Sequence, residues 1–235
     1  MSPFIGEFIG TMLLIIMGDG VVANVVLNKT KGNNGGWIVI VFGWAMAVFL
    51  GVYVSTSLGG SGHLNPAVTI AMTAFDNFDA ALLPTYILAQ FGGAITGAII
   101  VWLAYKQHFD STDDKDGKLA VFCNAPAIRG YGYNLITEIV GTFVLVFGAL
   151  AMSKPSSTLG TLDALPVGLL ILGIGLSLGG PTGYAINPAR DLGPRIAHFI
   201  LPIKNKRDSD WGYSWIPVVG PIIGALIAAY LFKLI

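Results

Sequence analysis

The tripeptide Asn-Pro-Ala occurs twice, at Asn65–Ala67 and Asn187–Ala189, and each copy opens a short apolar stretch. Asn is a favoured N-cap and Pro is favoured at the first helical position, so each triplet predicts the beginning of a helix. The two helices, Pro66–Phe75 and Pro188–Ile200, would reach only about 15–20 Å, roughly half of the ~30 Å hydrocarbon core of a bilayer. Such re-entrant half-helices are tolerated at membrane depth only where their lead-in is buried in protein or lines a wet cavity.

Composition places this chain in a membrane. Of its 235 residues 54% are hydrophobic and only 11% are charged, whereas a soluble domain carries about 25% charged residues. The net charge of zero argues against a nucleic-acid partner. The single Cys123 excludes an intramolecular disulfide. The start of the chain lacks the positive region of a signal peptide, so its first apolar segment is expected to remain as a spanning helix.

Six segments are apolar and long enough, at about 20 residues, to span a bilayer. They are Pro3–Leu27, Trp37–Ser57, Ala80–Tyr105, Asn134–Met152, Thr161–Leu178 and Trp215–Leu234. The segments between them, including Lys106–Tyr133, Ser153–Gly160 and Pro202–Tyr213, are interpreted as solvated connectors and turns.

The order of span, span, half-helix and span occurs twice, and side chains repeat with it. Glu7–Thr11 matches Glu138–Thr142 in its Glu, Gly and Thr positions. Three spans per repeat is an odd number, so the second copy must enter the membrane from the opposite face. The predicted fold is therefore an all-α membrane protein with six transmembrane helices and two re-entrant half-helices in an inverted repeat. It forms a single domain, 1–235, with repeat one at about 1–108 and repeat two at about 131–235.

Inversion predicts that the N-termini of the two half-helices meet near the membrane midplane. Each terminus carries unpaired N–H groups and about half a positive charge. The side-chain oxygens of Asn65 and Asn187 can cap their own helices and leave both NH2 groups as pore donors. The glycine-rich lead-ins Gly59–Leu64 and Gly179–Ile186 can present a row of carbonyl acceptors. This combination suits a small, neutral, polar solute.

Among the charged residues within the apolar segments, Arg190, Glu7 and Glu138 are candidates for function. Arg190 follows the second triplet, where its charge adds to the positive helix end, and this costly placement favours a pore function over snorkelling. Glu7 and Glu138 are either proton-relay carboxylates or braces that accept N–H groups from the lead-ins, and their symmetry favours braces. His63 is either a pore-wall or a loop-bracing residue.

No catalytic or metal-binding constellation is evident in the sequence. His108 and His198 are too scattered for a metal site, and no nucleophile–base pair or phosphate loop is present. We therefore expect no enzyme activity, no cofactor and no metal.

The paired triplets and the Glu–Gly–Thr repeat resemble the major intrinsic protein family of aquaporins and glycerol facilitators, over essentially the whole chain. Asp191 after Arg190, and Arg195 at the end of Asp-Leu-Gly-Pro-Arg, are similar to the aquaglyceroporin branch as found in bacteria, with Asp191 as its marker. The first lead-in reads Gly-Ser-Gly-His where the family usually has Ser-Gly-Ala-His or Ser-Gly-Gly-His.

The resemblance implies a selectivity filter of Trp44, Gly175, Tyr184 and Arg190. Gly175 stands where water-only channels usually carry His, and it is expected to open space. Trp44 and Tyr184 would flank the carbon skeleton of a polyol, although Trp44 precedes Asn65 by one residue more than usual and Tyr184 replaces the commoner Phe. Backbone carbonyls would line the pore at Gly62, His63, Leu64, Thr182 and Gly183.

The implied function is passive facilitation of glycerol and other small uncharged solutes, with water, while protons and ions are excluded. Urea, dihydroxyacetone and lactic acid are further candidate solutes. Implied partners are the lipid bilayer and three further copies in a homotetramer, in the cell membrane, with both termini cytoplasmic. Two alternatives remain: a strict water channel, and a proton-coupled transporter that uses Glu7 and Glu138.

Overall fold

The computed structural model describes residues 2–75, 78–152 and 162–235, and the regular structure in these ranges is entirely helical. Its first half contains α1 (Pro3–Val26), α2 (Trp37–Ser57), α3 (Pro66–Phe75), η1 (Ala80–Leu82) and α4 (Leu83–Ala104). Its second half contains α7 (Tyr131–Met152), α8 (Leu165–Leu178), α9 (Pro188–Ile200) and α10 (Ile216–Leu234). Between them lie α5 (Lys106–Ser111) and α6 (Lys115–Phe122).

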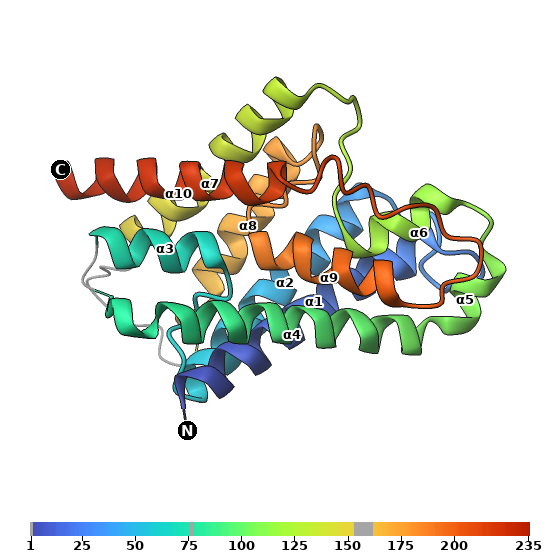
Figure 1. Ribbon diagram of the computed structural model, residues 1–235, viewed down its shortest axis with the longest axis horizontal. Coiled ribbons are helices and arrows are strands. Elements are labelled where there is room, and N and C mark those ends of the chain that lie inside the picture. The colour runs from blue at the N-terminus through green and yellow to red at the C-terminus, as the bar shows by residue number, and fades with distance from the viewer. Residues whose placement is uncertain (1, 76–77, 153–161) are drawn as a thin grey trace.

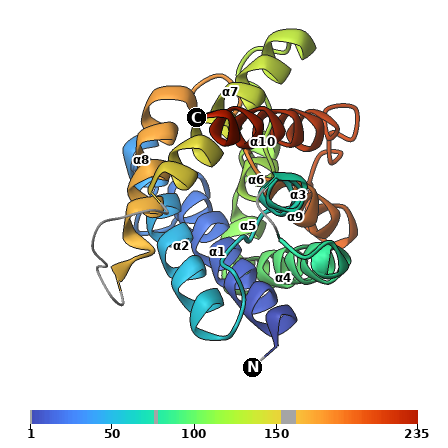
Figure 2. The ribbon, with the colours of Figure 1, turned by 90° about the vertical axis from the view of Figure 1, so that its left-hand side faces the viewer.

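The two halves pack in the same way, and the short helix of each half also packs against a long helix of the other half. Helix α1 packs against α2 and α4, and α7 packs against α8 and α10. The short helix α3 packs against α10 of the other half, and α9 packs against α4. Figures 1 and 2 show α3 and α9 end to end among the longer helices, with both chain termini at one end of the bundle. The predicted all-α fold with two re-entrant half-helices is confirmed.

The exterior of the bundle is apolar, as a lipid-facing surface requires. Large hydrophobic side chains such as Ile38 (70% exposed) and Leu88 (67% exposed) point away from the protein. Within the described residues five helices are long and apolar enough to cross a membrane.

The sixth predicted span is shorter than expected. Helix α8 has 14 residues and begins at Leu165, with Pro166 in its first turn, where proline is preorganised for a helix start. The proposed start at Thr161 and the expected turn at Ser153–Gly160 lie outside the described residues.

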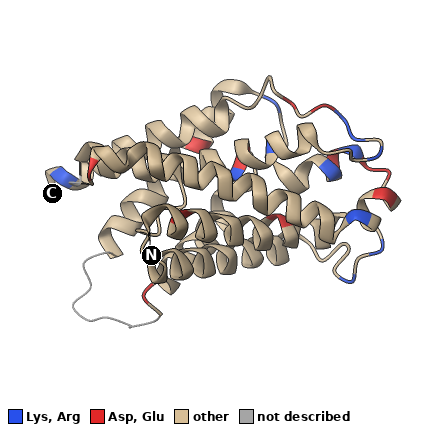
Figure 3. Cartoon of the chain, turned by 60° about the horizontal axis from the view of Figure 1, so that its bottom comes forward, with Lys and Arg blue, Asp and Glu red and all other residues tan. Residues whose placement is uncertain are grey.

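Charged side chains gather at the end of the bundle opposite the termini (Figure 3). The stretch Lys106–Tyr133, predicted as a solvated connector, lies there, and that prediction is wrong for α5 and α6. Asp114 caps α6, its Oδ1 accepting from the backbone N of Asp116 at 3.0 Å. Lys118 of α6 is buried and donates to the carbonyl oxygen of Lys204 at 2.6 Å. This segment is therefore a packed cap over the helix ends.

Candidate functional site

The two half-helices meet through their asparagines. Asn65 Oδ1 accepts from Ala67 N at 2.9 Å, and Asn187 Oδ1 accepts from Ala189 N at 3.0 Å. The amide nitrogens cross over: Asn65 Nδ2 donates to Ile186 O and Asn187 Nδ2 to Leu64 O, each at 2.8 Å. Since each NH2 has two hydrogens, one hydrogen ties the opposite lead-in. The sequence predicts each NH2 group as a pore donor. Because one hydrogen bonds the opposite lead-in, the other hydrogen remains for a solute.

The residue before each asparagine is held in an unusual backbone conformation. Leu64 has φ 52° and Ile186 has φ 44°, a region that is sparsely populated by bulky residues and rare for β-branched ones. Each is held on both sides, because its N–H donates to a buried carboxylate and its carbonyl accepts from the opposite asparagine. Surrounding bonds of this kind are what allow such strain to persist.

The carboxylate in the first half is Glu7, which is completely buried. Its Oε1 accepts from Ser55 Oγ at 3.0 Å and from His63 N at 3.1 Å. Its Oε2 accepts from Leu64 N and Gln90 Nε2, each at 2.8 Å. Four donors therefore surround one charge, which offsets the cost of burying it.

Glu138 occupies the matching place in the second half. Its Oε1 accepts from Thr182 Oγ1 at 2.6 Å and from Ala185 N at 3.0 Å, and its Oε2 accepts from Ile186 N at 2.8 Å. Both glutamates thus bond the lead-ins, and neither lines the two cavities that meet at Arg190. This geometry favours braces over proton relays.

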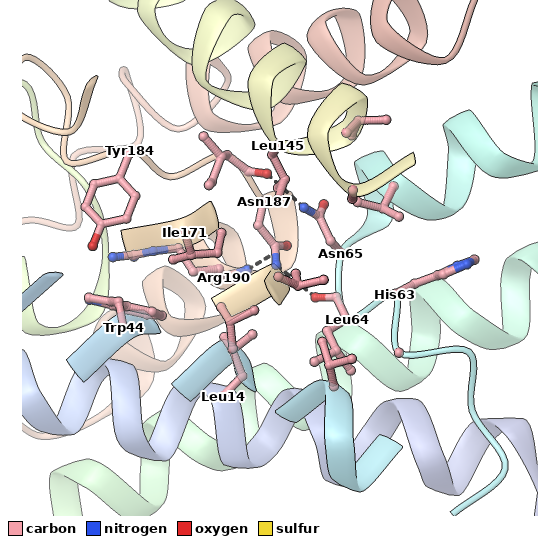
Figure 4. A pocket seen from close by; sticks show the side chains of 18 of the residues that line it. Leu14, Trp44, His63, Leu64, Asn65, Leu145, Ile171, Tyr184, Asn187 and Arg190 are labelled. Atoms are coloured by element: carbon pink, nitrogen blue, oxygen red, sulfur yellow. Dashed lines mark hydrogen bonds between the residues drawn. The ribbon is translucent and has the colours of Figure 1, made fainter. Parts of the chain in front are cut away.

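Two cavities follow one another along the molecule. The inner one, about 300 Å³, is lined by both asparagines and by Gly62, His63 and Leu64. The outer one, about 270 Å³, is lined by Thr182 and Gly183 of the second lead-in. Both cavities include Trp44, Tyr184 and Arg190 in their walls, so these three side chains stand where the cavities meet (Figure 4).

The junction brings together three separate parts of the chain. Trp44 comes from α2, Tyr184 from the lead-in to α9, and Arg190 from the first turn of α9. The guanidinium carbon of Arg190 lies 4.1 Å from the centroid of the Trp44 ring, within cation–π range. All three residues are less than 10% exposed. A solute that moves between the cavities must pass two aromatic faces and one fixed cation.

Gly175 does not open space at this junction. It lines neither cavity, and a Cβ added to it would lie 2.5 Å from Val41 Cγ1 and 2.9 Å from Tyr184 Cζ. Trp37 meets the Tyr184 ring edge-on at 5.9 Å between centroids, and its Nε1 donates to Gly175 O at 3.1 Å. The room that glycine leaves is therefore filled by the tyrosine ring.

A sequence model of one family, described as Major intrinsic protein, matches residues 1–232. The chain belongs to the major intrinsic protein family.

Similar members of this family carry names that mention small solutes. A probable glycerol uptake facilitator protein from Thermotoga maritima is 58% identical over 99% of both chains. A D/L-lactic acid transporter from Lactiplantibacillus plantarum is 42% identical over 96% of this chain and 94% of its own length. The X-ray structure of the aquaglyceroporin from Plasmodium falciparum superposes with a TM-score of 0.87, at 32% identity, over 98% of this chain and 94% of that one.

The sequence analysis did not predict that the residues after α6 line the outer cavity of this major intrinsic protein. Cys123 and Asn124 line it, and Asn124 Nδ2 donates to Thr182 O at 2.9 Å. Asp191 Oδ2 accepts from Asn124 N at 2.7 Å, and Asp191 Oδ1 pairs with Arg195 Nε at 2.9 Å. The signal was available, because an apolar run, Leu119–Cys123, interrupts an otherwise charged connector.

The histidines lie in three different settings. His63 lines the inner cavity and its Nδ1 is 3.2 Å from Thr69 Oγ1, so it is at once a wall residue and a bracing residue. His108 Nδ1 is 3.0 Å from Asn28 O, and His198 Nδ1 is 2.8 Å from Ser209 Oγ. Over the described ranges, no three His, Cys, Asp or Glu side chains are grouped as a metal would require.

Proposed function

We propose that this major intrinsic protein is a passive channel for glycerol and other small uncharged solutes, with water. The observation that carries the proposal is the junction of the two cavities. There Trp44 and Tyr184 offer apolar faces to a carbon skeleton, and Arg190 offers donors to hydroxyl groups. A polyol has one apolar side and one polar side, and the junction matches both.

The wider path supports the same assignment. The walls of the inner cavity are mostly apolar, with side chains such as Leu14, Val48 and Ile171 facing it. The remaining N–H of each midplane asparagine would donate to a passing hydroxyl, and the lead-in carbonyls would accept from it. No carboxylate among the described residues lines either cavity, so a cation would find no counter-charge.

A positive electrostatic potential where the two short helices meet would exclude protons. The N-termini of α3 and α9 face each other, each with about half a positive charge, and Arg190 adds a full one. Pores of the aquaporin type are understood to repel protons through such dipole ends and an Arg. We extend this explanation to the present chain.

Assembly and orientation are part of the proposal. We infer a homotetramer in the cell membrane with both termini cytoplasmic, on the family resemblance. Counting Lys and Arg in the loops assigns the opposite orientation by the positive-inside rule, because these residues gather at the end away from the termini. We follow the resemblance, which implies cytoplasmic termini against the direction of the charge count.

The proposal is tested by stopped-flow light scattering on proteoliposomes under a glycerol gradient. We expect glycerol permeability well above that of empty liposomes. Permeability equal to that of empty liposomes would refute the channel. Water flow without glycerol flow would favour the strict water channel. Uptake that saturates and collapses with a protonophore would favour the proton-coupled transporter.

Lactic acid is a second candidate solute. A relative of 42% identity is named as a transporter of it, and its neutral form has the size and polarity of glycerol. We expect its flux to rise as pH falls toward the pKa of the free acid, because the junction accepts uncharged solutes. Flux at neutral pH equal to that at acidic pH would contradict entry as the neutral acid.

A further inference from the structure

Trp37 stands just outside the junction of the two cavities. It is the first residue of α2 and lines the outer cavity but not the inner one. Tyr184, Trp44 and Arg190, in contrast, line both. The indole of Trp37 contacts the Tyr184 ring and the backbone of α8, so it links a residue of the junction to the helix behind it.

Packing sets the position of the Tyr184 ring. Its hydroxyl is buried and has no hydrogen-bond partner in the described part of the chain. One side of the ring lies against α8, where Gly175 and Gly179 are four residues apart and therefore share a helix face. A Cβ added at Gly175 would lie 2.9 Å from Tyr184 Cζ, and one added at Gly179 would lie 2.5 Å from Tyr184 Cδ1. These two glycines make the surface on which the ring rests.

Trp37 covers a second side of the ring. The two aromatic rings meet edge-on, with 5.9 Å between centroids and an interplanar angle of 83°, which is a favourable arrangement for an aromatic pair. The Cβ added at Gly179 would also lie 2.8 Å from Trp37 Cζ2. The indole and the phenol ring therefore pack side by side on the same stretch of α8.

The indole is itself anchored. Trp37 Nε1 donates to Gly175 O at 3.1 Å, and α2 packs against α8. Because Trp37 lines only the outer cavity, it stands on the outer side of Tyr184. It therefore blocks movement of the Tyr184 ring outward, away from Trp44 and Arg190.

We propose that Trp37 is a positioning residue of the junction, which holds the Tyr184 ring beside the solute path and so limits the size of polyol that passes. The proposal deepens the channel function proposed above and rests on it. Without the indole, the ring can move into the outer cavity, and the junction widens. Trp37 thus acts through Tyr184, whereas Trp44 and Arg190 face the solute themselves.

The test is stopped-flow light scattering on proteoliposomes with water, glycerol and the four-carbon polyol erythritol. We expect Trp37→Ala to raise the ratio of erythritol to glycerol permeability about fivefold, on the scale of one lost aromatic pair. Trp37→Phe keeps an aromatic ring and should change the ratio less than Trp37→Ala does. Trp37→Leu takes the place of Trp37→Ala, with the same expected direction, if the alanine variant does not fold. Ile38→Ala is the matched control on α2, because Ile38 is 70% exposed and should leave the ratio unchanged.

A double-variant cycle separates positioning from a general loss of structure. In a Tyr184→Ala background, Trp37→Ala should change the ratio less than twofold, because the ring on which the indole acts is gone. An equal rise of the ratio in both backgrounds would overturn the proposal. So would a fall of all three permeabilities by the same factor.

Gly175→Ala provides a second readout, because its Cβ displaces the Tyr184 ring from the α8 side. Gly175→Ala combined with Trp37→Ala should pass glycerol faster than Gly175→Ala alone, since the displaced ring then has room on its outer side. A double variant slower than Gly175→Ala would overturn the positioning role. Wild-type glycerol permeability equal to that of empty liposomes would overturn the channel together with this role, whereas wild-type flux with an unchanged polyol ratio in Trp37→Ala would overturn the role of Trp37 alone.

Discussion

The substitution Gly175→Ala tests how the Tyr184 ring shapes the junction. The new Cβ would lie 2.5 Å from Val41 Cγ1 and 2.9 and 3.0 Å from Cζ and Oη of Tyr184. Ordinary contacts between carbon atoms are about 3.5–4.0 Å, so the ring must shift by about 0.5–1 Å. Trp37 packs against one edge of the ring, which leaves movement toward Arg190 and the solute path. Overpacking of this kind costs about 1–3 kcal/mol.

The assay is stopped-flow light scattering, with glycerol and water permeability measured on the same proteoliposomes. If about 1.4 kcal/mol of the strain appears in the barrier for glycerol, its flux falls about tenfold. Water is smaller than glycerol, so its flux should fall about twofold or less. Gly173→Ala is the matched control in α8, because a Cβ there meets nothing within 4 Å. A Gly175→Ala variant that transports glycerol as well as Gly173→Ala would refute the reasoning.

Three further predictions concern the braces and the filter. Glu138→Gln should lower the free energy of unfolding by roughly 1–3 kcal/mol, because an amide NH2 cannot accept from Ile186 N, and a buried unpaired donor costs about that much. An unchanged thermal midpoint would contradict the brace. Asn187→Asp should lower both the thermal midpoint and glycerol flux, because it places a carboxylate oxygen against Leu64 O in place of a donor at 2.8 Å, and wild-type flux would argue against the crossed bond. Tyr184→Phe should change the free energy of unfolding by less than about 1 kcal/mol, because the buried hydroxyl has no partner among the described residues. A loss above about 2 kcal/mol in the thermal melt would reveal a bond that the structure lacks.

Most of the fold could be predicted from short-range chemistry. Asn is a favoured N-cap and Pro a favoured first helical residue, and an apolar run of about 20 residues is long enough to span a bilayer. The exceptions were α5 and α6, where charged residues made Lys106–Tyr133 look solvated. That stretch also contains four buried apolar residues, Leu119, Val121, Phe122 and Cys123, beside the outer cavity that Cys123 lines. Local composition could not reveal this packing because it depends on α1 and α9, which contact α6 from distant parts of the chain.

The candidate site also combines features set by residues close in sequence with features set by long-range packing. By itself the sequence determined that two half-helices begin at Asn65 and Asn187, that Arg190 follows one of them, and that the chain lies in a membrane. Only the tertiary structure decided that each asparagine bonds the opposite lead-in and that the Tyr184 ring fills the room beside Gly175. Helix starts and apolar runs depend on neighbours in sequence. These contacts join residues far apart in sequence, and only the packed bundle brings them within bonding distance.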